Sequence, residues 1–337
     1  MTSHARTTRE AALTRRSALA LLAAACLAPA PVPGQPADRR SHVAVLSATA
    51  SRTAEVVRAF EQRLRELGYV DGSTLTLDFV SAEGRLDRLP ELAARLVARG
   101  PGVIAAIGGA ESAFAARGAT TAIPIVFTVA TDPVADGLVP SVARPGANIT
   151  GVSSLNAELD GKRLELLKEV MPGLKRAAVL VNPSDRTSAQ ALKRVETGAQ
   201  VLGLRLNTFE VRTPAEIDAA MGRAKAGSEA VLLLGTPYFF SHQSRVAVLA
   251  AKHRLPTIAP WREFPAAGGL MGHGTNVREM FRRSADMVAR ILKGARPGDM
   301  PVEQPTTFEL VFNARTAEAL GITLGPALLT RADMVLR

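Results

Sequence analysis

Small and hydroxylated side chains gather where the short apolar runs of this chain come to an end. Such ends carry the segments Ser47-Ala48-Thr49, 108–112, 129–133, 182–185, 235–239 and Pro260-Trp261-Arg262. In an open α/β sheet, ligands bind outside the carboxyl ends of the strands. Because these ends hold few charges, we expect a site that contacts a small molecule through hydroxyl and backbone groups.

The Gly108-Gly109 pair allows two interpretations. Backbone N–H groups at a helix N-terminus bind anions, so residues 108–112 can hold a carboxylate. Alternatively, the two glycines only make a tight turn between a strand and a helix. The pair is not a nucleotide fingerprint, because Gly-x-Gly-x-x-Gly and the Walker Gly-Lys-Ser/Thr motif are both absent from the sequence.

Polar residues at two other strand ends are equally open to interpretation. Asp132, which precedes Pro133, can hold a ligand amine or cap a helix that begins at the proline. A proline at the first helical position favours the cap. Asn182 has the same two interpretations, and its polar neighbours Ser184 and Asp185 leave both open.

Aromatic residues make up only 4% of the chain, so those at strand ends carry weight. Trp261, the only tryptophan, either stacks on a ligand or fills a gap beside Phe264. Residues 238–240 (Tyr-Phe-Phe) can form a wall of the cleft, although we expect at least one of these rings to pack on the core.

The sequence lacks the patterns that catalysis would require. His242, His253 and His273 are not spaced as a metal-binding pair on one helix face. No Gly-x-Ser-x-Gly nucleophile motif occurs, and no close pair of acids is placed at two strand ends as a glycosidase would need. We therefore expect no catalytic residue, no metal site, no cofactor and no enzyme activity.

The elements that place these residues occur twice in the same order. Val43-Ala44-Val45-Leu46 opens one block, and residues 177–181 open another. Later segments match in pairs: 75–80 with 206–211, 103–108 with 230–235, and 123–126 with 255–258. Apolar runs that alternate with amphipathic stretches are typical of βαβ units and parallel sheets. The repeat predicts two α/β lobes with a ligand cleft between them.

Each block can be divided into elements. The first has expected strands at 43–46, 75–80, 103–107 and 125–128, and helices at 53–67, 86–99 and 110–117. The second has strands at 177–181, 205–211, 230–234, 257–259 and 268–271, and helices at 158–170, 188–202, 214–225 and 241–253. Helices at 280–292 and 314–320 and a strand at 308–312 fall outside the repeat. We assign residues 38–151 to lobe 1, to which roughly 276–305 return, and residues 152–275 to lobe 2, to which roughly 306–337 return.

Composition limits the classes of function. The chain has 337 residues, is 47% hydrophobic and carries a formal net charge of +10. Its basic residues are interspersed with acidic ones, as in Arg63-Leu64-Arg65-Glu66, and form no long basic run. We therefore expect no binding to nucleic acid.

Residues 1–37 read as a signal peptide and a proline-rich linker. Arg6, Arg9, Arg15 and Arg16 precede a ten-residue apolar stretch, ALALLAAACL, which is too short to span a bilayer. Thr14-Arg15-Arg16-Ser17 is similar to a twin-arginine signal. Cys26, the only cysteine, lies in a segment similar to a bacterial lipobox, and two interpretations stay open: a lipidated N-terminal cysteine, or an ordinary residue that is removed with the signal peptide. We expect a periplasmic protein, exported by a Sec or twin-arginine signal.

Several motifs resemble those of ABC-transporter substrate-binding proteins related to the tryptophan-binding lipoprotein. They are Leu67-Gly68-Tyr69-Val70-Asp71-Gly72, Thr131-Asp132-Pro133-Val134, Arg144-Pro145-Gly146-Ala147, Arg262-Glu263-Phe264, Ile291-Leu292-Lys293-Gly294 and Pro301-Val302-Glu303-Gln304. The resemblance covers roughly residues 42–335. It implies a type I periplasmic binding protein, an α/β fold in which two Rossmann-like lobes with parallel sheets are joined by a hinge. It also implies capture of a small solute without catalysis.

The resemblance places the ligand between strand-end loops of both lobes. Carried onto this sequence, it assigns ligand contact to Ser47, Thr49, Gly109, Glu111, Ser112, Thr131, Asp132, Asn182, Asp185, Thr236, Tyr238 and Trp261. Residues 109–111 and 236–239 depart from the segments expected for a tryptophan binder, so the resemblance does not carry tryptophan itself over as the ligand. The turn at 108–112 together with Trp261 and Tyr238 predicts a small carboxylate with an apolar or aromatic body, such as an amino acid or aromatic acid.

Three functions are consistent with such lobes. We expect the solute-binding component of an ABC importer, a monomer whose partners are a small-molecule ligand and a membrane permease. The alternative is a periplasmic sensing module for a membrane receptor or kinase, which needs the same lobes. A LacI-like repressor would need an N-terminal helix-turn-helix, and this chain has an apolar run and prolines there.

Overall fold

The computed structural model describes residues 40–129, 131–154, 159–305 and 307–337. The predicted signal peptide, the proline-rich linker and Cys26 lie outside the described residues. Arg40–Arg337 forms one compact unit. Among the helices within the described ranges, none is both long and apolar enough to cross a membrane.

The first sheet is built from strands whose central residues are mostly apolar. Its order is β2-β1-β3-β4-β5, and every pair of neighbours is parallel. The strands are β1 (Ser41–Ser47), β2 (Leu75–Ser81), β3 (Val103–Ile107), β4 (Ile125–Val129) and β5 (Ile149–Ser153). The residues of β3, β4 and β5 are all buried, as expected for parallel strands covered on both faces.

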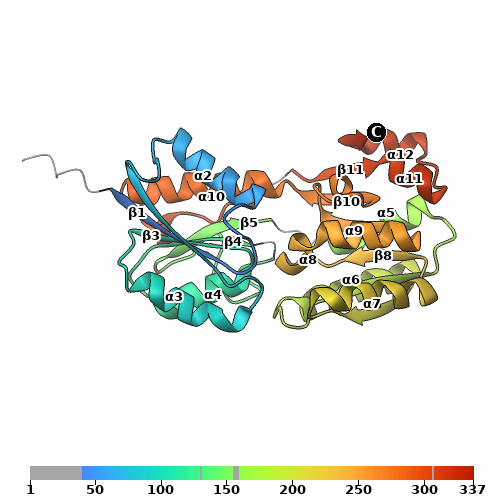
Figure 1. The fold of residues 1–337 in the computed structure, drawn as a ribbon, viewed down its shortest axis with the longest axis horizontal. Helices are drawn as coiled ribbons and strands as arrows, with labels where there is room; N and C mark the ends of the chain where they lie inside the picture. The colour runs from blue at the N-terminus through green and yellow to red at the C-terminus, as the bar shows by residue number, and fades with distance from the viewer. Residues whose placement is uncertain (1–39, 130, 155–158, 306) are drawn as a thin grey trace, which may run out of the picture. The chain divides into compact units, whose positions relative to one another are not determined.

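Helices cover both faces of this sheet. On one face lie α2 (Glu55–Glu66) and α10 (Val277–Leu292), and on the other lie α3 (Leu89–Val97), after the 3₁₀ turn η2 (Leu86–Arg88), and α4 (Ala110–Ala119). In α2 the buried Val57, Phe60 and Leu64 recur at helical spacing and form the apolar stripe that faces the sheet. Figure 1 shows α10 alongside α2, although they are far apart in the sequence.

The second sheet is larger and has one antiparallel pair. Its order is β12-β11-β10-β9-β8-β6-β7, and only β10 and β11 run antiparallel among the described pairs. Its strands are β6 (Arg176–Val181), β7 (Arg205–Glu210), β8 (Ala230–Leu233), β9 (Thr257–Trp261), β10 (Met271–Thr275), β11 (Glu309–Asn313) and β12 (Met334–Leu336).

Two apolar clusters place helices on both faces of the second sheet as well. One contains residues of α5 (Asp160–Val170), α6 (Ser188–Leu202), α11 (Ala314–Leu320) and α12 (Pro326–Arg331). The other contains residues of α7 (Pro214–Gly227), α8 (Pro237–Ser241) and α9 (Gln243–His253). The 3₁₀ turns η4 (Pro265–Ala267) and η5 (Pro297–Asp299) lie in connecting segments. The predicted α/β fold of two lobes with mainly parallel sheets is confirmed.

A buried ion pair lies where the chain passes between the lobes. Arg163, which is 1% exposed, donates to Asp160 Oδ1 at 2.8 Å and to the carbonyl oxygen of His273 at 2.8 Å. Arg194 donates to the other oxygen of Asp160 at 3.2 Å. Burial lowers the pKa of Arg163 to about 10, so the guanidinium stays charged at neutral pH. The pair therefore ties α5 to β10, from which the chain continues into α10 of the first lobe.

Several details differ from the expected elements. The strand β5 is not predicted by the sequence, and the strand expected at 268–271 is displaced, because β10 begins only at Met271. Asp132 does not start a helix: its Oδ1 accepts hydrogen bonds from the backbone of Val134 and Ala135 within a turn. The short helix α8 was expected as part of the preceding loop.

Candidate ligand-binding cleft

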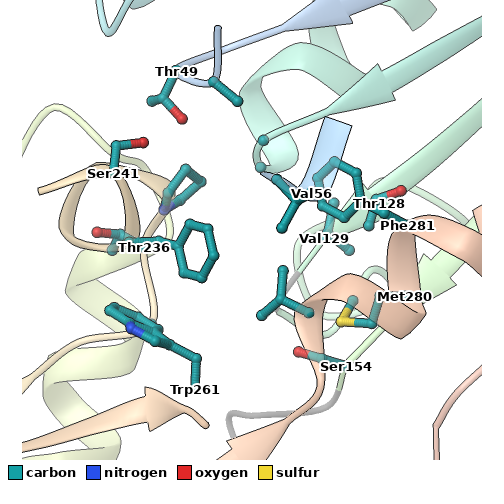
Figure 2. Close-up of a pocket in the computed structure, with 17 residues that line it drawn as sticks. Thr49, Val56, Thr128, Val129, Ser154, Thr236, Ser241, Trp261, Met280 and Phe281 are labelled. Atoms are coloured by element: carbon teal, nitrogen blue, oxygen red, sulfur yellow. The ribbon is translucent and has the colours of Figure 1, made fainter. Parts of the chain in front are cut away.

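A cleft lies between the carboxyl ends of the strands of the two lobes. The cavity that remains between them is about 80 Å³. This is smaller than the ~300–1,000 Å³ usual for small-molecule sites, so a ligand of that size requires the lobes to move apart. The lining residues come from both lobes: Thr49, Ala50, Val56, Gly108, Gly109, Thr128, Val129, Ser154, Gly235, Thr236, Pro237, Phe240, Ser241, Trp261, Val277, Met280 and Phe281. Figure 2 shows Thr236, Ser241 and Trp261 on one side of the cleft and Val56, Met280 and Phe281 on the other.

Large apolar side chains form much of this lining. Trp261 is 3% exposed, and its indole Nε1 donates to Gln243 Oε1 at 2.8 Å. The ring of Phe240 meets the indole edge to face, with centroids 5.4 Å apart. Met280 and Phe281 reach the cleft from the first turns of α10. These side chains offer a preformed surface for an aromatic or aliphatic group.

The polar lining consists of hydroxyl and backbone groups. Thr49, Thr128, Ser154, Thr236 and Ser241 supply the hydroxyls, and no charged side chain belongs to the lining among the described residues. Thr236 caps α8, because its hydroxyl accepts a hydrogen bond from the backbone of Phe239. The Thr128 hydroxyl is hydrogen-bonded to Ser284 of α10 at 2.5 Å. Thr49 lies at the edge of the cleft shown in Figure 2.

The turn into α4 directs the start of a helix at the cleft. Gly108 and Gly109 both have a positive φ, of 77° and 117°, which glycine adopts without strain. The helix begins at Ala110, and no side chain from the described part of the structure caps it. Its first N–H groups and the positive end of its dipole are therefore suited to a carboxylate beside Gly108 and Gly109.

Gly109 is also a point of close approach between the lobes. A Cβ atom at this position would lie 2.6 Å from Cγ of Pro237, the first residue of α8. Only glycine permits this distance without displacement of one lobe from the other. The lobes are thus closed around the cleft.

The structure brings four of the predicted ligand residues into this cleft: Thr49, Gly109, Thr236 and Trp261. A smaller adjoining cavity is lined by Glu111, Asn182, Asp185 and Tyr238, together with Thr49 and Gly109. Their contact with a ligand stays a prediction.

Two polar side chains of the smaller cavity, Asn182 and Asp185, are engaged by their own loop. Asn182 Oδ1 accepts from the backbone of Ser184, and Asp185 Oδ1 accepts from the backbone and hydroxyl of Thr187. Burial raises the pKa of Asp185. Burial likewise raises the pKa of Tyr238 to about 12, and its ring stacks on that of His242 at 4.5 Å.

The remaining predicted residues lie outside both cavities and are hydrogen-bonded within the first lobe. Ser47 donates to the carbonyl of Ala50, and Ser112 donates to the carbonyls of Ile107 and Gly109. Thr131 is bonded to Asp136, and Asp132 stabilises its own turn. These bonds shape the strand ends, and a ligand role for these four residues also stays a prediction.

Sequence reasoning missed the lining that α10 and two strand ends provide. Val277, Met280 and Phe281 belong to a helix that falls outside the repeat, so its position over the first lobe had no counterpart to indicate it. Thr128 is the penultimate residue of β4 and Ser154 directly follows β5, which was not predicted. The available signal was the helical spacing of apolar residues in 277–292.

A wider cavity adjoins the cleft and shares Thr49, Ala50, Val56, Phe240 and Ser241 with it. Glu263, which follows β9, lines this cavity. Its Oε2 is buried and has no hydrogen-bond partner among the described residues. Burial raises the pKa of Glu263 to about 7. Within the described ranges, no group of three or more His, Cys, Asp or Glu side chains is arranged to hold a metal ion.

Comparisons with known proteins agree with this geometry. Residues 43–336 match the family described as ABC transporter substrate binding protein. A tyrosine-binding protein of Clostridioides difficile (strain R20291) is 28% identical over 263 residues, which are 78% of this chain and 75% of that protein.

Two solved structures are similar to this fold over 88% of the chain, each at 25% sequence identity. An ABC domain from Streptococcus pneumonia in complex with L-Trp, covered completely, has a TM-score of 0.80. A ligand-free, open substrate-binding protein with adhesive properties from Clostridium difficile, covered to 99%, has a TM-score of 0.62. The fold of this chain is therefore more similar overall to the L-Trp-bound domain than to the ligand-free, open protein.

Proposed function

This chain belongs to the family of ABC transporter substrate-binding proteins, and on that premise we propose that it captures a small carboxylate with an aromatic body. The ligand is an aromatic amino acid or a related aromatic acid. The observation that carries the proposal is the composition of the cleft, in which Trp261, Phe240 and Phe281 face hydroxyl groups and the start of α4.

The aromatic body of the ligand lies among the rings. Full burial of a side chain the size of Phe contributes about 1.5–3 kcal/mol. A favourable ring pair adds about 0.5–1.5 kcal/mol. The indole of Trp261 is held by Gln243, so little side-chain entropy is lost when a second ring stacks on it.

The carboxylate of the ligand lies at the first turn of α4. The helix dipole places roughly half a positive charge there. Gly108 and Gly109 line the cleft and have no side chain to keep the carboxylate from the backbone N–H groups. The Thr49 hydroxyl, beside Gly108, is a further donor. Such a site holds an anion without an arginine or lysine.

The relatives support this class of ligand. The relative from Clostridioides difficile is named for tyrosine, and the similar domain from Streptococcus is in complex with L-Trp. Family membership supports the next step, in which the closed, loaded protein delivers its ligand to the membrane permease of an ABC importer. The basic and apolar N-terminal segment supports export to the periplasm, where that delivery takes place.

Calorimetry and fluorescence with matched ligands test the proposal. Trp261 is the only tryptophan, so its emission reports directly on the cleft. We expect L-phenylalanine, L-tyrosine and 3-phenylpropionate to bind and to change this emission. Phenethylamine lacks the carboxylate, and we expect it to bind at least about 10-fold more weakly, since a hydrogen bond to a charged group is worth about 1.5–3 kcal/mol. Equal binding of phenethylamine and L-phenylalanine, or a response to neutral sugars alone, would contradict the proposal.

A further inference from the structure

An ion pair joins the two lobes beside the cleft. Arg186, in the loop after β6, donates from its Nε to Glu111 Oε1 of α4 at 2.8 Å. The backbone N–H of Arg186 donates to the same oxygen at 3.2 Å. The guanidinium also lies over the ring of Phe114, 4.3 Å from its centroid. One residue of lobe 2 thus makes three contacts with one helix of lobe 1.

The lobe 1 half of this contact is held in place by its own lobe. Glu111, Phe114 and Arg117 are spaced by three residues on α4 and therefore share one helix face. Arg117 lies over the Phe114 ring at 5.0 Å and donates to the carbonyls of Gly137 and Leu138 at 2.8 and 2.7 Å. These bonds fix the ring against lobe 1 whether or not lobe 2 is near.

The lobe 2 half is equally ordered. Arg186 lies in a loop in which Asn182 bonds to Ser184 and Asp185 bonds to Thr187, on either side of it. The side chains of Asn182 and Asp185, which accept these bonds, are both buried. The backbone that carries Arg186 is therefore preorganised, and its contact with α4 requires only that the lobes approach.

We propose that Glu111, Phe114 and Arg186 form an interlobe clasp, which stabilises the closed state and slows ligand release without touching the ligand. The inference rests on the proposed function. A contact between residues of different lobes exists only when the lobes are closed, so its free energy shifts the equilibrium toward closure. The clasp also gives Glu111 a role other than the ligand contact expected from the sequence.

The expected size of the effect follows from exposure. The Glu111 side chain is 15% exposed and that of Arg186 is 55% exposed, so the pair is partly screened by solvent. Partly exposed ion pairs and cation–π contacts are each modest, and together they predict that loss of the clasp raises the Kd and the dissociation rate about 3- to 10-fold.

A double-mutant cycle tests the clasp. Arg186→Ala, Glu111→Ala and the double variant are compared with L-tyrosine and 3-phenylpropionate as ligands in stopped-flow dissociation. We expect each single variant to release both ligands about 3- to 10-fold faster, and the double variant to be no worse than either. Arg212→Ala is the matched control, because it removes a surface ion pair with Glu210 inside one lobe and should leave release unchanged. If Glu111 instead held the ligand amine, its substitution would affect tyrosine but not phenylpropionate.

A second measurement does not depend on the ligand. Cys26 is the only cysteine, so the full chain with Cys26→Ser can carry spin labels at Arg95→Cys and Lys252→Cys, one in each lobe. We expect Arg186→Ala to shift the interlobe distances toward longer values, with or without 1 mM L-tyrosine. Unchanged distances and release rates in Arg186→Ala, or a protein with no closed population in either condition, would overturn the clasp. If no aromatic acid binds, the proposed function fails, and the ligand-free distances still decide on the clasp.

Discussion

The indole of Trp261 and the side-chain amide of Gln243 are joined by a hydrogen bond of 2.8 Å between Nε1 and Oε1. Gln243 is the first residue of α9, and Trp261 is the last residue of β9. The bond therefore fixes the plane of the indole in the cleft. The residue that fixes it belongs to α9 and not to the strand that carries Trp261. A substitution at Gln243 can therefore change the orientation of the indole while the ring itself remains.

Gln243→Leu replaces the amide with a branched apolar side chain and so removes the acceptor. We expect an aromatic ligand to bind about 3- to 10-fold more weakly, because the buried indole N–H loses a partner and the ring is no longer held. Calorimetry with L-phenylalanine measures the change, and Trp261→Ala should weaken binding further. Gln200→Leu, at an exposed position of α6, is the control. A Gln243→Leu variant with unchanged affinity would show that the bond does not orient the ring.

The close approach of Gly109 and Pro237 predicts a coupling between lobes. Gly109→Ala places a Cβ atom 2.6 Å from Pro237 Cγ, so the lobes cannot close fully and affinity for an aromatic acid should fall at least about 10-fold. Alanine is also strained at the φ of 117°, and that strain lowers stability independently of the lobes.

Pro237→Ala separates these two causes. In the double variant with Gly109→Ala, affinity should recover in part while the loss of thermal stability persists. Gly118→Ala is the control on the same helix, because a Cβ there meets no described heavy atom within 4 Å. No recovery in the double variant would show that backbone strain, and not the contact, lowers affinity.

The Asp160–Arg163 pair is expected to contribute to stability through its burial. Asp160→Asn removes the negative charge beside a guanidinium that is 1% exposed. Loss of one partner of a buried pair typically costs about 3–5 kcal/mol. Urea unfolding measures this loss. Lys162→Gln on the same helix removes a pair about half exposed, with Glu165, and should change the free energy of unfolding by less than about 1 kcal/mol. Similar losses in both variants would refute the role of burial.

Glu263 predicts a pH dependence of stability. Burial raises its pKa to about 7, from an ordinary 4.5, so the folded protein keeps a proton that the unfolded chain releases between these values. This contribution is fully present below about pH 4.5 and is lost as the pH rises through about 7. It amounts to on the order of 3 kcal/mol, since one pKa unit is worth about 1.4 kcal/mol.

Glu263→Gln carries an amide that does not titrate. Relative to the unsubstituted protein, it should gain free energy of unfolding between pH 5 and pH 8, as followed by urea titration. Glu196→Gln, at an exposed position, should show no such gain. An equal difference between variant and parent at both pH values would mean that Glu263 has no raised pKa.

The repeat in the sequence was sufficient to predict two α/β lobes, because parallel strands buried on both faces are continuous apolar runs. The repeat did not predict the strands whose position depends on close contacts between backbones. Gly151 interrupts the apolar pattern of β5, yet a Cβ there would lie 2.3 Å from the carbonyl oxygen of Phe127. Gly272 of β10 is likewise required, because a Cβ would lie 2.3 Å from the carbonyl oxygen of Trp261. Such close contacts between strands leave no periodic signal.

Prediction of the cleft lining was limited in the same way. Thr49, Thr236 and Trp261 follow apolar runs, so the strand-end rule located them. Met280 and Phe281 lie on a helix that is far in the sequence from any strand of lobe 1, and only the tertiary structure places them in the cleft. The strand-end rule also included Ser112 and Asp132, whose side chains are bonded to their own turns.

The position of α10 over the first sheet has a consequence for how the chain is made. All strands of that sheet are complete at Ser153, but the apolar face that includes Val43 and Val126 is covered in part by Met287 and Val288 of α10. In a chain emerging from the ribosome, the second lobe must therefore be synthesised before α10 can cover the first sheet. Until then the apolar face of the first sheet is exposed, which gives chaperones a long interval to bind. Any chain that ends before residue 277 is therefore prone to aggregation.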